Sequence, residues 1–149
     1  MKKILLGMIL IVLSFSLTGC NKEEANVTEK NETVYVESKI IDNLKNTVRV
    51  DIRELTEDKI VGTITDSETI NELIDAISTS SYSGSDCLAD AHQMELEMYD
   101  ENDNLLDTID FWPNIERIRP ENSSNNCYFN VQGENTVKNI IESETDYKF

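Results

Sequence analysis

The alternation of polar and apolar residues in Thr47–Leu55 (TVRVDIREL) constrains the fold more than any other feature of the chain. The valines and isoleucine of this segment fall on one side of an extended chain, and its arginines and aspartate fall on the other. Gln93–Tyr99 (QMELEMY) has the same period of two. Each segment is therefore predicted to be a strand with one solvent-exposed face. The apolar faces need a second layer of secondary structure to cover them.

A helix is predicted directly after the strand at Lys59–Thr65 in the sequence. Thr65-Asp66-Ser67-Glu68 has the pattern of a capping box, in which the Thr65 hydroxyl accepts a hydrogen bond from the backbone three residues on and Glu68 reaches back. Apolar side chains follow at i, i+3, i+4 and i+7, which indicates a helix of about three turns with one apolar stripe. The stripe consists of Ile70, Leu73, Ile74 and Ile77.

The remaining patterns complete an α+β prediction. They indicate strands at Val34–Val36, Lys59–Thr65, Leu105–Trp112, Ile115–Arg119 and Cys127–Val131, a loop at Ser78–Asp86, and a terminal helix from Glu134 to about Ser143. This order predicts a small antiparallel sheet of about five to six strands with two helices packed on one face.

The first 19 residues are predicted to be an export signal. Met1-Lys2-Lys3 is basic, and Ile4–Leu17 is almost wholly apolar but shorter than the roughly 20 residues that a membrane-spanning helix needs. The alternative is a buried core helix, against which the position at the extreme N-terminus argues.

The exit from this leader, Leu17-Thr18-Gly19-Cys20, resembles the lipobox of bacterial membrane lipoprotein precursors. The resemblance implies that the Cys20 thiol carries diacylglycerol, that residues 1–19 are cleaved off, and that the lipid holds the protein at the extracytoplasmic face of the cell membrane. Only a thiolate is nucleophilic enough to form the thioether, and two or three acyl chains, at ~0.8 kcal/mol per buried CH₂, anchor a protein stably. An ordinary signal exit with a leftover thiol is the alternative.

The mature chain would be acidic. The formal charge of the whole sequence is −16, and loss of Lys2 and Lys3 with the leader leaves 11 basic against 29 acidic residues, a charge of −18. Such a chain repels phosphate backbones, so nucleic acid is excluded as a partner. The acidity either serves solubility or forms a docking surface for a cationic protein or small ligand. Residues 20–33 are predicted to be a flexible acidic tether and 34–149 a single extracytoplasmic domain.

Two cysteines, Cys87 and Cys127, remain once Cys20 is lipidated. An even pair in an exported domain favours a disulfide, and closing this loop of 40 residues is worth ~4 kcal/mol in the chain-entropy model. Two buried thiols are one alternative. A metal site built from both cysteines and His92 is another, although Cys-x₄-His with one distant cysteine is not a recognised zinc pattern.

No catalytic residue, cofactor or metal site is predicted from the motifs. His92 is the only histidine, and the nearby serines lack a Gly-x-Ser-x-Gly elbow. The acidic turn at 100–104 has neither the glycine nor the glutamate of an EF-hand loop. Trp112 and Tyr82 are candidate contacts for a partner. Trp112 is expected to face away from the core. It is then either an exposed anchor for a partner or covered by a loop such as Ser123–Asn126.

These features predict a cell-envelope lipoprotein whose domain is a non-catalytic binding module of accessory or immunity type. The alternative is an envelope hydrolase that uses His92 or a pair of carboxylates. An enzyme would need these groups to converge at one site.

Overall fold

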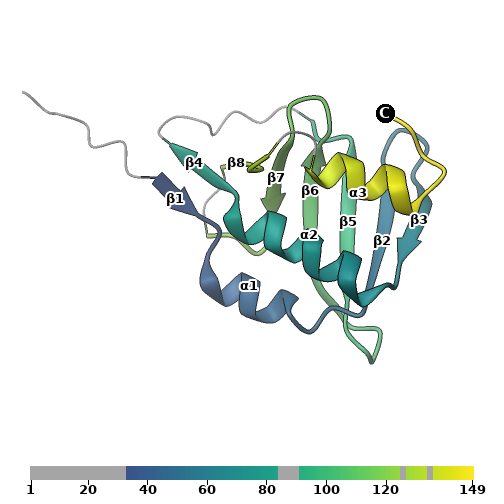
Figure 1. The fold of residues 1–149 in the computed structure, drawn as a ribbon, viewed down its shortest axis with the longest axis horizontal. Coiled ribbons are helices and arrows are strands. Elements are labelled where there is room, and N and C mark those ends of the chain that lie inside the picture. The colour runs from purple at the N-terminus through teal and green to yellow at the C-terminus, as the bar shows by residue number, and fades with distance from the viewer. Residues whose placement is uncertain (1–32, 84–90, 125–126, 134–135) are drawn as a thin grey trace, which may run out of the picture. The chain divides into compact units, whose positions relative to one another are not determined.

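Eight strands form one antiparallel sheet in the computed structural model (Figure 1), which describes residues 33–83, 91–124, 127–133 and 136–149. All of these residues belong to one compact unit, Asn31–Phe149. The strand order is β1-β4-β8-β7-β6-β5-β2-β3. The strands are β1 (Thr33–Tyr35), β2 (Arg49–Glu54), β3 (Lys59–Ile64), β4 (Ser81–Ser83), β5 (Met94–Tyr99), β6 (Leu105–Trp112), β7 (Arg117–Pro120) and β8 (Phe129–Asn130).

Three helices lie against one face of this sheet (Figure 1): α1 (Ser38–Leu44), α2 (Ser67–Thr79) and α3 (Thr136–Glu144). The buried side chains of all three helices join those of the strands in a single apolar core. The predicted alternation of β5 is confirmed, because Met94, Leu96 and Met98 are buried in that core and the residues between them are partly exposed.

The predicted α+β class is confirmed, but the predicted counts of five to six strands and two helices are wrong. Helix α1 escaped prediction because only Ile40 and Leu44 of its seven residues are buried, which is too weak a stripe to recognise. Strand β4 lies where a loop was predicted, and it forms only by pairing with β1 and β8.

Helix α2 confirms the apolar stripe of Ile70, Leu73, Ile74 and Ile77, all of which are buried. Its predicted cap is wrong by one residue. The N-cap is Asp66, whose carboxylate accepts a 2.9 Å hydrogen bond from the backbone N–H of Thr69. An aspartate one position later satisfies the same helix-end donors as the predicted threonine would.

Helix α3 has its N-terminal N–H groups capped by a residue distant in sequence. The Glu116 Oε1 atom accepts hydrogen bonds from the backbone N–H groups of Val137 at 2.8 Å and Lys138 at 3.3 Å. Burial raises the pKa of Glu116, and these hydrogen bonds offset that rise only in part. The predicted start of this helix, Glu134, lies outside the described residues.

Several predictions fall on residues that the structure does not describe: the leader 1–19, Cys20, residues 21–32 of the tether, and Cys87. Cys127 is described and is disulfide-bonded. Since neither other cysteine is described, the pairing of Cys87 with Cys127 stays a prediction. Within the described ranges, no helix has the length and apolar character that crossing a membrane requires.

Candidate functional site

The face of the sheet opposite the helices carries a row of four charged residues, one from each of four neighbouring strands. Arg53 of β2 pairs with Glu95 of β5, Glu95 pairs with Asp110 of β6, and Asp110 pairs with Arg119 of β7. The charges along the row therefore run positive, negative, negative, positive. Two carboxylates directly opposite each other repel, so the middle of the row needs a compensating group.

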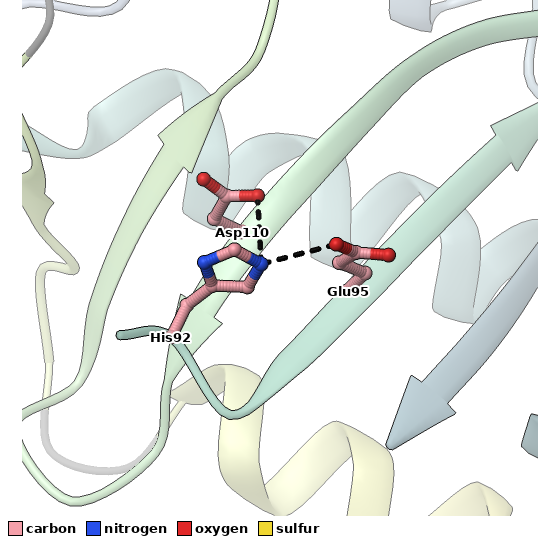
Figure 2. A group of neighbouring side chains, drawn as sticks. All are labelled: His92, Glu95 and Asp110. Atoms are coloured by element: carbon pink, nitrogen blue, oxygen red, sulfur yellow. Dashed lines mark hydrogen bonds and ion pairs between the residues drawn. The ribbon is translucent and has the colours of Figure 1, made fainter. Parts of the chain in front are cut away.

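His92 occupies the position between these two carboxylates (Figure 2). It lies in the segment that leads into β5, and its Nε2 atom is 3.0 Å from Glu95 Oε1 and 3.4 Å from Asp110 Oδ1. One ring nitrogen thus faces two carboxylate oxygens. All three atoms lie within 4.8 Å of one another.

Asp110 is the buried member of this cluster, with a side chain that is 1% exposed. Arg119 donates to its Oδ2 atom through Nε at 2.8 Å and also through Nη2. The Oδ1 atom, which faces His92, has no hydrogen-bond partner among the described residues. A buried carboxylate oxygen in that state costs free energy, of the order of 1–3 kcal/mol.

Trp112 lies beside the cluster, where its ring contacts His92 and Arg119. It does face away from the core, as predicted, but it is only 6% exposed. Its ring contacts those of His92 and Tyr128 at centroid distances of 5.5 and 5.7 Å, and the Arg119 guanidinium lies 5.8 Å from its centre. In this conformation Trp112 therefore offers little surface to a partner. The other candidate contact, Tyr82, is half-buried and packs edge-on against Phe129.

The other arginines of this face are held by neighbouring side chains. Arg53 donates to Glu97 at 2.8 Å, Arg49 lies over the ring of Tyr99, and Arg117 lies over the ring of Tyr128. Burial raises the pKa of Glu97, but hydrogen bonds from Arg53 and Tyr99 outweigh it and leave that pKa below its ordinary value. Contacts of this kind fix the surroundings of the His92 cluster.

A second feature is an acid-lined groove between α2 and α3, with a volume of about 530 Å³. Glu72 and Asp75 of α2 line one side, Asn139 of α3 contributes to the other, and Ala76 and Ile140 supply apolar surface. Glu68, Glu72 and Asp75 are spaced i, i+4 and i+7 along α2, and this helix contains no basic residue. One face of the helix is therefore uniformly negative.

A third feature is a hollow of about 400 Å³ between α1 and the sheet, where Asp107 of β6 meets Lys39, Asn43 and Asn122. The Oδ1 atom of Asp107 accepts hydrogen bonds from the backbone N–H groups of Thr108 and Asn122, while its Oδ2 atom has no partner among the described residues. Burial raises the pKa of Asp107.

Sequence reasoning singled out His92 but missed the residues around it. In the described part of the chain, its polar partners are Glu95 and Asp110, and no serine is among them. A signal was present: a hairpin that turns at 100–104 places Glu95 opposite Asp110. The alternative metal site of Cys87, His92 and Cys127 needs a free Cys127 thiolate, whereas Cys127 is disulfide-bonded. Cys87 itself lies outside the described residues.

Comparison with known proteins found no match: no protein-family model, no curated protein and no solved structure matches the chain.

Proposed function

We propose that this protein is a lipid-anchored lipoprotein of the bacterial cell envelope and that its folded part is a non-catalytic binding module, of accessory or immunity type, for a cationic protein. The resemblance of Leu17–Cys20 to a lipobox supports the location. The charge of −16 supports the choice of partner, because it attracts cations and repels nucleic acid.

The observation that carries this proposal is the groove between α2 and α3. Glu72 and Asp75 border it, while Ala76 and Ile140 give it an apolar surface. A lysine or arginine side chain suits such a groove, since its aliphatic stem packs on apolar atoms while its charged end meets carboxylates. The helix that carries the acids has no basic residue to compete for them.

The test uses the full chain in detergent micelles and a fluorescently labelled lysine-rich peptide as the probe. Fluorescence anisotropy measures binding to the wild type and to the double variant Glu72→Gln/Asp75→Asn. We expect the variant to bind several-fold more weakly at low salt. The difference should shrink at about 0.2 M salt, because ions screen exposed charges.

The matched control is Glu101→Gln/Glu121→Gln, which removes the same two charges from exposed positions elsewhere. We expect this control to bind the peptide like the wild type. If the two double variants lose affinity equally, net charge alone drives binding and the groove has no role. Crosslinking in cell envelopes, with the same pair of variants, then tests whether one envelope protein depends on the groove.

The envelope hydrolase remains a second candidate because His92 and two carboxylates do converge, as such an enzyme requires. A neutral imidazole at this position could act as a general base toward a water molecule. Ester, amide and glycan substrates are the panel to assay. Hydrolysis by the wild type that His92→Gln abolishes would favour the enzyme over the binding module.

A further inference from the structure

The cluster of His92, Glu95 and Asp110 has the composition and spacing of a cation site. Its three facing atoms are one imidazole nitrogen and two carboxylate oxygens, which are ligand types that zinc accepts. At zinc bond lengths of about 2.0–2.2 Å, two ligands in tetrahedral geometry lie about 3.3 Å apart. The observed separations from His92 Nε2 are 3.0 and 3.4 Å.

Internal hydrogen bonding does not account for the cluster. If His92 Nε2 carries a proton, it donates at 3.0 Å to Glu95, and Asp110 Oδ1 is left without a hydrogen bond although the side chain is 1% exposed. The two carboxylates also face each other directly across β5 and β6. A bound cation would relieve both costs, because it would accept electron pairs from all three groups at once.

Residues next to the cluster hold the three proposed ligand side chains in fixed orientations. Arg119 binds the Oδ2 atom of Asp110 and so leaves Oδ1 facing His92. The Trp112 ring packs against the imidazole in a T-shaped pair, with a centroid distance of 5.5 Å, and limits its rotation. Supporting contacts that orient the ligands are typical of metal sites.

We propose that His92 Nε2, Glu95 Oε1 and Asp110 Oδ1 bind one divalent transition-metal ion of the Zn²⁺ type. Zinc usually takes four ligands, so three protein ligands leave at least one coordination position open. Solvent can reach that position, because the side chains of His92 and Glu95 are 23% and 22% exposed. An imidazole ligand favours zinc over Mg²⁺ or Ca²⁺, which prefer oxygen alone. This site lies on the open face of the sheet and is independent of the α2–α3 groove.

The test is a zinc titration of the ¹⁵N-labelled full chain in detergent micelles, followed by NMR. His92 is the only histidine, so the imidazole nitrogen signals report this site alone. We expect the His92 signals to move and to saturate at one zinc per chain, with no such change on adding Mg²⁺. Glu95→Gln and Asp110→Asn should each weaken zinc binding at His92 by about 10-fold or more.

Glu97→Gln is the matched control, because Glu97 lies two residues along β5 on the same face and contacts Arg53 rather than His92. Its zinc affinity should equal that of the wild type. Because Asp110 is buried, circular dichroism must show that its variant is folded, and the partly exposed Glu95 provides the second variant. The proposal is overturned if zinc leaves the His92 signals unchanged, or if folded Glu95→Gln binds zinc as tightly as the wild type.

Discussion

Asp107 and Asp110 are two buried aspartates of one strand whose side chains face opposite sides of the sheet. Asp110, on the open face, has Arg119 as an ionic partner. Asp107, on the helix side, receives hydrogen bonds from two backbone N–H groups. Burial raises the pKa of Asp107 because these bonds only partly replace the water that its carboxylate loses.

The raised pKa makes Asp107 a source of pH-dependent stability. An unfolded aspartate titrates near 3.9, so in the window between that value and the raised pKa the folded state binds more protons than the unfolded state. The free energy of unfolding should therefore rise as pH falls through this window. Asp107→Asn should lack this contribution, because an amide does not titrate, so its free energy of unfolding should not rise in this window. Urea denaturation at several pH values measures it, and identical pH profiles for the two proteins would contradict it.

The packing of α3 on β3 depends on the absence of a side chain at Gly62. A Cβ atom built there would overlap Cγ2 of Thr145 and lie 2.9 Å from its Cβ atom. Thr145 is held in place, since its hydroxyl donates to the carbonyl of Ile141 at 2.8 Å and accepts from the N–H of Tyr147 at 3.1 Å. The end of α3 can therefore approach the strand only over a glycine.

We expect Gly62→Ala to lower the free energy of unfolding by about 1–3 kcal/mol, the usual cost of overpacking. Thr145→Ser removes Cγ2 but keeps the hydroxyl, so it should restore part of the loss in the double variant. Thermal or urea denaturation of both single variants and the double variant measures this coupling. Additive effects would show that the contact between Gly62 and Thr145 is not the cause.

The lipid proposed on Cys20 would decide where the folded unit resides. We expect the wild type to fractionate with membranes and to carry the added mass of acyl chains. Cys20→Ser should lose both, because a hydroxyl cannot replace the thiolate. Cell fractionation and intact-mass spectrometry provide the measurement. A serine variant that kept the wild-type fractionation would contradict the proposed anchor.

The two remaining cysteines offer a separate prediction about the folded unit. We expect Cys87 to be the disulfide partner of Cys127, and Cys87→Ser to lower the free energy of unfolding by about 2–4 kcal/mol. Peptide mapping without reduction identifies the bridge, and urea denaturation gives the stability. Recovery of Cys87 alkylated without prior reduction would contradict this pairing.

The strands and helix with strong periodicity could be predicted from sequence alone. The alternation of β5 and the stripe of α2 are local patterns, and side-chain direction follows the backbone period. The capping-box pattern predicts an N-cap at Thr65, one residue before the observed N-cap Asp66, because both residue types are good N-caps. Helix α1 and strand β4 have no such pattern. Helix α1 contacts α2 and β6, and β4 pairs with β1 and β8, so both elements depend on segments distant in sequence.

The sequence by itself therefore determined the α+β class, the α2 stripe, the acidity and the outward direction of Trp112. Only the tertiary structure decided the order of the eight strands, the burial of Trp112, and the meeting of His92 with Glu95 and Asp110. The physical reason is that periodicity fixes which way a side chain points, whereas its neighbours depend on the register between strands that are distant in the chain.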